Sequence, residues 1–223
     1  MPTIRPPAEW PLLLCGPMLR RVTPHAVSVF VALKEAREVW LDIHSSPDPG
    51  TPGHHIVYPL PGHGVTWTPT HALGERLHVL CLTLTLPDTA NNLKPPKIYG
   101  YDLKFRRGPG TPELSLAEID DNLLAGDHPL GYAPGWLPSF CLPPAELKDL
   151  NLVHGSCRKP HGEGRDMLAV LDDLIAQERG SHLLRPHQLF LTGDQIYADD
   201  VNLCLLRTLT ETGKELIGWD EAM

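Results

Sequence analysis

Apolar and polar positions alternate with a period of two along much of the first half of the chain. Such alternation is typical of β-strands that bury one face. Four segments that are rich in β-branched and aromatic residues show this pattern: 26–33, 37–43, 77–86 and 98–105. Turn-forming sequences separate them. The pattern predicts an N-terminal tail over residues 1–13 and then an all-β sandwich over residues 14–107, of immunoglobulin or fibronectin type.

Residues 108–148 combine one helical signal with a long irregular stretch. The segment SLAEIDDNLLAG (115–126) predicts a single helix, with Ser115 as its N-cap and Glu118 placed for a capping box. The many Pro and Gly residues that follow it favour irregular backbone. We therefore expect 108–148 to be a linker and a loop that wraps over the next domain.

The hydrophobic period changes near residue 149. A strand, a helix, a strand and a helix are expected in turn, at 150–155, 164–180, 187–193 and 199–213. Asp199 or Asp200 is the expected cap of the last helix. This order predicts parallel strands and the opening β-α-β-α of an α/β domain over 149–223. Two strands do not complete a stable open sheet, so we expect the chain to be an N-terminal fragment or a truncated product.

Charge and cysteine content narrow the function classes. The net charge is −8 and the Lys and Arg residues form no block, which argues against binding to a nucleic-acid duplex. The five cysteines are scattered without a C-x-x-C pair, so neither a zinc finger nor a redox dithiol is expected. No cleavable signal or membrane-spanning segment stands out, and we expect a cytoplasmic protein that does not associate with membranes.

The best candidates for chemistry lie where the two expected parallel strands end. HGSCR (154–158) closes the first strand and TGDQIYADD (192–200) closes the second. Ligands bind beyond such carboxyl ends, and neighbouring strands are roughly 4.8 Å apart, so Cys157 and Asp194 would meet if these strands are neighbours. Asp194 and Tyr197 share a side in a helical turn. A thiol, a carboxylate and a phenol at one edge predict part of a metal site.

The pair GSCR and GDQIYADD resembles the PhoD-like alkaline phosphatase/phosphodiesterase family of the calcineurin-like metallophosphoesterase superfamily. A β-sandwich ahead of the catalytic domain is similar to that family's layout. The resemblance implies that Cys157 and Tyr197 bind Fe3+ and that Asp194 bridges Fe3+ and Ca2+, although a different divalent metal pair is possible. It implies hydrolysis of a phosphoester substrate, with Asp194 and Tyr197 as catalytic residues. Arg158 is a candidate contact for the substrate phosphate.

The chain departs from that family because it contains no Gly-Asn-His segment to supply further metal ligands. We therefore expect this chain alone to have little or no activity. A cysteine-nucleophile phosphatase would need an arginine six residues after Cys157, where Glu163 stands instead, and no P-loop is present. The alternative outside enzymology is a non-catalytic interaction protein or remnant built on the β-sandwich. The monoester or diester preference, the substrate itself and the oligomeric state stay open.

Each candidate residue also has a purely structural interpretation. Cys157 could be a buried, inert thiol, Asp194 could cap a turn, and Tyr197 could be a packed core residue. Two further motifs are set aside. The Asp42-Ile43-His44 sequence has a metal-motif spelling, but it lies far from Asp194, and we expect an exposed His44. His54 and His55 lie in a Pro/Gly loop, where we expect both to be solvated.

Overall fold

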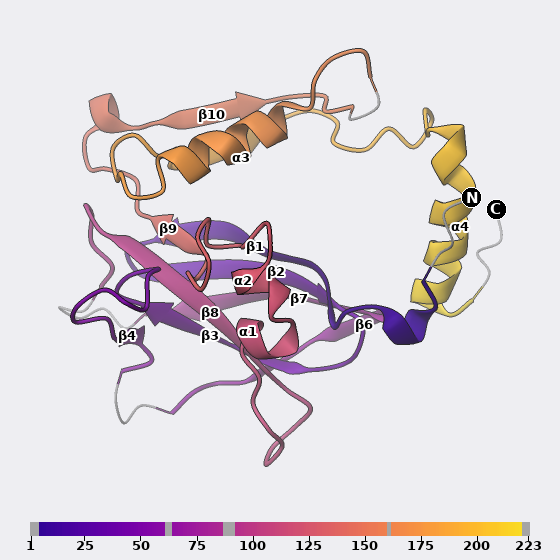
Figure 1. Cartoon of the computed structure of the whole chain (residues 1–223), viewed down its shortest axis with the longest axis horizontal. Helices are drawn as coiled ribbons and strands as arrows, with labels where there is room; N and C mark the ends of the chain where they lie inside the picture. The colour runs from indigo at the N-terminus through magenta and orange to yellow at the C-terminus, as the bar shows by residue number, and fades with distance from the viewer. Residues whose placement is uncertain (1–4, 61–63, 87–91, 160–161, 220–223) are drawn as a thin grey trace. The chain divides into compact units, whose positions relative to one another are not determined.

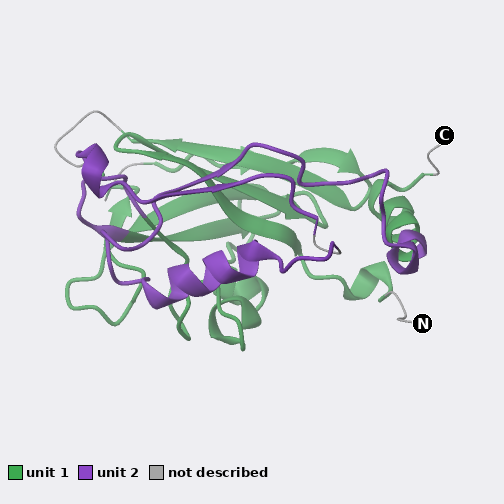
Figure 2. Ribbon diagram, turned by 90° about the horizontal axis from the view of Figure 1, so that it is seen from above, with its two compact units in different colours: residues 1–93, 99–140, 208–223 green, residues 94–98, 141–207 purple. Residues whose placement is uncertain are grey.

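Antiparallel β-strands make up most of the regular structure. In a computed structural model that describes residues 5–60, 64–86, 92–159 and 162–219, about 32% of the chain is strand and 20% is helix. The chain divides into two units, which are coloured separately in Figure 2. Unit 1 comprises residues 1–93, 99–140 and 208–223, and unit 2 comprises 94–98 and 141–207.

The first sheet of unit 1 has four strands in the order β1-β2-β7-β6. Their bounds are β1 Leu13–Thr23, β2 Ala26–Leu33, β6 His71–Gly74 and β7 Leu77–Thr85 (Figure 1). The buried face of the central pair is apolar, with Val27 opposite Leu84, Val29 opposite Leu82 and Val31 opposite Leu80. The strands predicted at 26–33 and 77–86 are confirmed. The start of β1 was not predicted, and the 3-10 turn Pro7–Glu9 precedes it within the predicted tail.

The second sheet of unit 1 follows the order β4-β3-β8-β9, and β5 pairs with β3. Its strands are β3 Glu38–His44, β4 Ile56–Tyr58, β5 Thr68–Pro69, β8 Ile98–Arg106 and β9 Ser139–Cys141. One face is again apolar and buried, with Val39 opposite Phe105, Leu41 opposite Leu103 and Ile43 opposite Tyr101. β3 also contacts β7 of the first sheet. Each sheet thus buries one apolar side, which is what a sandwich requires.

The opposite face of β3 and β8 carries a buried polar network. The Trp40 indole N–H donates to the Asp42 carboxylate at 2.7 Å, and Lys104 Nζ donates to Asp102 at 2.8 Å. The Leu116 backbone N–H also donates to Asp102, at 3.1 Å. Burial raises the pKa of the Asp42 carboxyl group. The bond from Leu116 ties the segment after β8 to the face of this sheet.

The single helix predicted over 115–126 is wrong: two short helices occupy this region, α1 Leu116–Ile119 and α2 Asn122–Ala125. Asp120 interrupts them with an extended backbone (φ −162°, ψ 113°), and its carboxylate accepts from the Asn122 N–H at 3.0 Å. A short Asp side chain competes in this way with helical hydrogen bonding. The predicted contact between Ser115 and Glu118 is present, since the Ser115 N–H donates to the Glu118 carboxylate at 2.7 Å.

The segment that follows α2 completes unit 1. Residues 99–140 belong to this unit, and β9 adds a strand beside β8. Tyr101 donates its N–H to the Pro138 carbonyl at 2.9 Å, and Phe140 is 2% exposed and stacks on Tyr99. That this stretch wraps over the following domain stays a prediction. The apolar residues within this Pro-rich stretch pack on the β module.

Unit 2 contains a parallel strand pair, as predicted. β10 (Leu152–Gly155) pairs in parallel with β11 (Gln188–Leu191), and α3 (Met167–Gln177) connects them. The 3-10 turn Leu147–Asp149 precedes β10. The last helix, α4, spans Leu203–Ile217.

The predicted caps of α4 at Asp199 and Asp200 are wrong. Asn202 takes that role, because its side-chain oxygen accepts from the Cys204 N–H at 3.0 Å. At the other end of α4, backbone N–H groups of Glu75 and Arg76 donate to the carbonyls of Ile217 and Leu216. None of the described helices has the combination of length and apolarity that crossing a bilayer needs. The expected turns over 87–91 and the final residues 220–223 lie outside the described residues.

Candidate functional site

The ends of β10 and β11 lie side by side, which brings the two motif segments to one edge. Gly155 is paired with Leu191 in the parallel register, and the Thr192 N–H donates to the Gly155 carbonyl at 3.1 Å. His154 Nε2 and Thr192 Oγ1 are hydrogen bonded at 2.7 Å. Residues 156–158 and 193–197 therefore leave the sheet from the same edge. We call this edge, with Cys157, Asp194 and Tyr197, the thiol–phenol rim.

Cys157 is exposed and lies at the centre of the rim. Its backbone is in the left-handed region (φ 53°), which is uncommon for a residue with a side chain. A hydrogen bond from Ser156, whose Oγ is 3.3 Å from the sulfur, lowers the pKa of the Cys157 thiol. Hydrogen bonds from the Tyr197 hydroxyl and the Asp194 backbone lower this pKa further. These donors favour the thiolate, the form of cysteine that binds metals and reacts with electrophiles.

Tyr197 is half-buried beside that sulfur. Its hydrogen bond to Cys157 is the largest cause that raises the pKa of the phenol. Burial and the negative charges of Cys157, Asp194 and Asp199 act in the same direction. The phenol therefore stays protonated when no cation is present. A cation would reverse this balance, because it stabilises both the thiolate and the phenolate.

Gly193 lets the two segments approach closely. A Cβ atom at this position would overlap Ser156 Oγ and would lie 2.8 Å from Cys157 Sγ and 3.0 Å from the Cys157 nitrogen. Asp194 follows directly, and its exposed carboxylate acts electrostatically on both Cys157 and Tyr197. The structure thus brings the segment that carries Asp194 against Cys157. That Cys157, Asp194 and Tyr197 hold a metal stays a prediction.

The donor set of the rim suits one cation. Carboxylate and phenolate oxygens are hard donors and the thiolate adds a soft one, and all three leave from the same sheet edge. Within residues 5–60, 64–86, 92–159 and 162–219, no group of three or more His, Cys, Asp or Glu side chains is placed to hold a metal ion.

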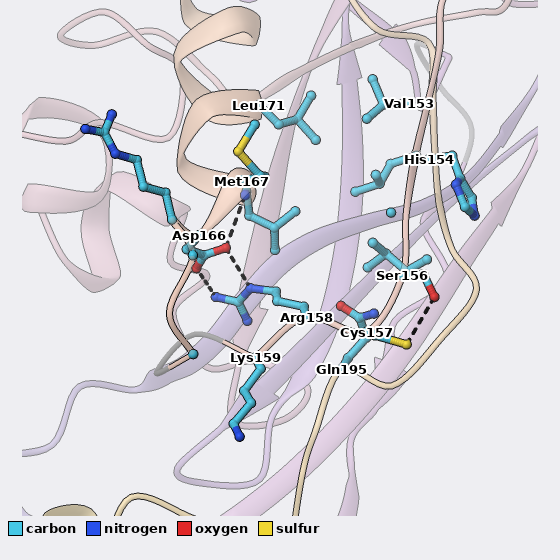
Figure 3. Close-up of a pocket in the computed structure, with 17 residues that line it drawn as sticks. Val153, His154, Ser156, Cys157, Arg158, Lys159, Asp166, Met167, Leu171 and Gln195 are labelled. Atoms are coloured by element: carbon cyan, nitrogen blue, oxygen red, sulfur yellow. Dashed lines mark hydrogen bonds and ion pairs between the residues drawn. The ribbon is translucent and has the colours of Figure 1, made fainter.

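Arg158 is engaged by a neighbouring carboxylate. Its Nε and Nη2 atoms donate to the two oxygens of Asp166 at 3.0 and 2.5 Å (Figure 3). This pair lowers the pKa of Asp166 and raises that of Arg158. The contact between Arg158 and a substrate phosphate stays a prediction. In this structure, two of the guanidinium N–H groups are already taken.

An open pocket of about 380 Å³ lies next to Cys157, between the strand pair and α3 (Figure 3). Its apolar wall consists of Val153, Leu168, Leu171, Leu189 and Leu191. Arg158, Lys159 and Arg165 supply positive charge, and Lys159 is paired with the Asp200 carboxylate.

The sequence interpretation missed the roles of Ser156, Gly193 and Asp166. In the sequence, only the G-S-C and T-G-D motifs indicated roles for Ser156 and Gly193.

The two histidine motifs that were set aside form a buried pair in unit 1. The expectations of an exposed His44 and a solvated His54 are wrong: both ring nitrogens of His44 and Nε2 of His54 are buried without a hydrogen-bond partner. Their rings stack with centroids 5.1 Å apart and planes 17° apart. His44 faces Gly100, which has no side chain, and Ser45 and His55 fold the intervening loop back through two hydrogen bonds.

This pair predicts an acid-sensitive unit 1. Burial and then the neighbouring His54 lower the pKa of His44 from 6.5 to about 4; Asp102 opposes this shift, and Lys104 adds to it. As the pH falls through 6.5, His44 gains a proton in the unfolded chain but not in the folded one, so stability is lost between 6.5 and about 4. Allowing for partial exposure, we expect a loss on the order of 2 kcal/mol that the His44→Phe variant does not share.

Urea unfolding at about pH 7 and about pH 4.5 measures this effect. All five tryptophans, Trp10, Trp40, Trp67, Trp136 and Trp219, belong to unit 1, so their fluorescence follows this unit. The His54→Phe variant shows whether the effect depends on the partner ring. If the difference in stability between wild type and His44→Phe is the same at both pH values, the prediction is refuted.

No known protein family, curated protein or solved structure matches this chain. The assignment of a function therefore depends on the geometry of the thiol–phenol rim and on the motifs that form it. The parallel register supplies the position, and the close approach of Gly193 to Cys157 supplies the contact between the two motifs.

Proposed function

We propose that the thiol–phenol rim is part of the metal site of a phosphoester hydrolase, similar to the PhoD-like phosphatases and phosphodiesterases. One observation carries this proposal. Cys157 lies against Gly193 at the carboxyl ends of two parallel strands, and Asp194 and Tyr197 follow that glycine along the chain. That edge is where open parallel sheets bind their ligands.

The donor types fit the proposed cofactor. We propose that Cys157, Asp194 and Tyr197 hold Fe3+ and that Asp194 also faces a Ca2+ ion, with another divalent pair as the alternative. A bound cation of this kind supplies positive charge that polarises a phosphoryl oxygen and acidifies a water molecule. Ca2+ takes six to eight oxygen ligands, of which the rim offers the Asp194 carboxylate. The rim is therefore better suited to the iron than to the calcium.

The chain's own residues have distinct roles in this proposal. Hydrogen bonds from Ser156, whose Oγ is 3.3 Å from the sulfur, and from the Asp194 backbone lower the pKa of the Cys157 thiol, which favours the form that binds a cation. Gly193 leaves the space that Ser156 Oγ and the sulfur of Cys157 occupy. Arg158 lies one residue beyond the sulfur, where its remaining N–H groups are available to a phosphate oxygen.

The Tyr197→Phe variant tests the proposed metal site. Iron bound by a tyrosinate absorbs visible light, so wild-type protein titrated with ferric citrate should develop a visible band. Tyr197→Phe should lose that band, because phenylalanine has no oxygen to bind the metal. Tyr58→Phe is the matched control: Tyr58 lies in β4 of unit 1, beside Trp40, and its loss should leave the band unchanged.

The outcomes of this titration separate the candidate functions. A wild-type protein that stays colourless and iron-free would overturn the proposed site. It would favour the second candidate, a non-catalytic interaction protein. Exposed apolar residues support that candidate, since Leu189, Phe190 and Leu191 of β11 are 44%, 47% and 44% exposed. Leu189 and Leu191 share the face of β11 that lines the pocket and Phe190 lies on the other face, so both faces of this strand are apolar.

A further inference from the structure

Asp166 makes two kinds of contact that link α3 to the thiol–phenol rim. It is the N-cap of α3, where its Oδ1 accepts from the Leu168 N–H at 3.2 Å. The same oxygen accepts from Arg158 Nε at 3.0 Å, and Oδ2 accepts from Arg158 Nη2 at 2.5 Å. Figure 3 shows this carboxylate between the start of α3 and the guanidinium. A bidentate pair of this kind fixes direction as well as distance.

Cys157 needs support on both sides because its backbone lies in the left-handed region. On the N-terminal side, the parallel register of β10 and β11 holds Gly155. On the C-terminal side, Arg158 is the next residue, and its side chain is held by Asp166. The described residues between Arg158 and Asp166 form no helix or strand. Within this stretch, the ion pair between Arg158 and Asp166 therefore holds the chain in place, because no helix or strand does so.

We propose that Asp166 is a positioning residue: through Arg158, it holds Cys157 beside Ser156 and Gly193 and so sets the geometry of the rim. The proposal rests on the proposed function for its consequence, since the rim would be a metal site. The positioning itself concerns only residues of this chain. It also gives Arg158 an orienting role beside any contact with phosphate.

The Asp166→Asn variant is the sharpest test. Asparagine is a good N-cap and keeps an oxygen for the Leu168 N–H, but it loses the ionic pair with Arg158. Arg158→Gln breaks the same pair and leaves the cap untouched. Asp173→Asn, an exposed residue of α3, is the matched control for the change in charge. If Asp166 acts through Arg158, the double variant should be no worse than either single variant.

The first measurement needs no metal. After a short pulse of iodoacetamide on the full chain at neutral pH, mass spectrometry gives the alkylation rate of Cys157, with exposed Cys204 as the internal standard. Both Asp166→Asn and Arg158→Gln should slow Cys157 about threefold or more, because the sulfur moves away from the Ser156 hydroxyl, whose Oγ is 3.3 Å from it. The rate at Cys204 should not change. Equal Cys157 rates in wild type and both variants would overturn the proposal.

The second measurement is the titration with ferric citrate. Changing a residue that supports a metal ligand typically costs 10- to 100-fold in affinity, so we expect Asp166→Asn to bind iron at least about tenfold more weakly and to keep the visible band. Slower alkylation without iron binding in any variant would keep the positioning role and refute the proposed function. Iron binding that is equal in wild type and both variants, with equal alkylation, would refute the positioning role alone.

Discussion

Gly193→Ala is expected to separate the two segments of the thiol–phenol rim and to weaken the binding of ferric ion about 100-fold or more. The new Cβ would overlap Ser156 Oγ and would also press on the nitrogen and sulfur of Cys157. The Cys157 nitrogen belongs to a backbone that pairing of β10 and β11 holds in place, so a rotamer change cannot relieve the clash. The two segments must separate, and Cys157 moves away from the residues that follow Gly193. A visible-band titration with ferric citrate measures the effect.

Gly180→Ala provides the control for this substitution. A Cβ atom at Gly180 meets nothing within 4 Å, although that residue also lies in unit 2. We expect it to bind iron as the wild type does. Tryptophan fluorescence should report an unchanged unit 1 in both variants. Near-normal iron binding by Gly193→Ala would show that the close approach at this glycine is not required by the site.

Phe105→Ala is expected to have the largest effect on stability, a loss of about 3–5 kcal/mol in the free energy of unfolding of unit 1. Phe105 is fully buried (0% exposed) in β8, opposite Val39. Its backbone also exchanges two hydrogen bonds with Leu114, at 2.8 and 2.9 Å, which join the segment before α1 to the sheet. Removing the ring leaves a cavity between well-packed neighbours, because the paired strands cannot collapse into it.

Urea unfolding followed by tryptophan fluorescence measures this loss. Leu73→Ala in β6 is the control, because Leu73 is 55% exposed and its removal opens no cavity. We expect that variant to lose less than about 1 kcal/mol. A similar small loss for Phe105→Ala would mean that the apolar face of β8 is not packed as described.

The sequence predicted the elements whose residues carry a local pattern. The strands at 26–33, 77–86 and 98–105 correspond closely to β2, β7 and β8, because period-two alternation reports directly on a half-buried strand. The parallel pairing of β10 with β11 followed from the strand–helix–strand order. The GSCR and GDQIYADD spellings, placed on those strand ends, pointed to Cys157, Asp194 and Tyr197.

Other elements depend on distant partners and carried no such pattern. The start of β1 becomes a strand because β2 offers it an edge, and β9 forms in a Pro-rich segment because β8 accepts it. Asp120 splits the helix predicted over 115–126 through a local side-chain bond that competes with the helical pattern. Propensity alone does not resolve such competition.

The sequence by itself determined the mostly β character of the first half, the parallel order of the second half and the residue types at the two strand ends. The tertiary structure decided the contacts between residues far apart in the chain. It stacked His44 on His54, engaged Arg158 with Asp166, and brought Gly193 against the sulfur of Cys157. The physical reason is that periodicity reports which face of an element is buried, whereas side-chain partners depend on register and on backbone turns. Gly193 and the left-handed Cys157 set those turns at the rim.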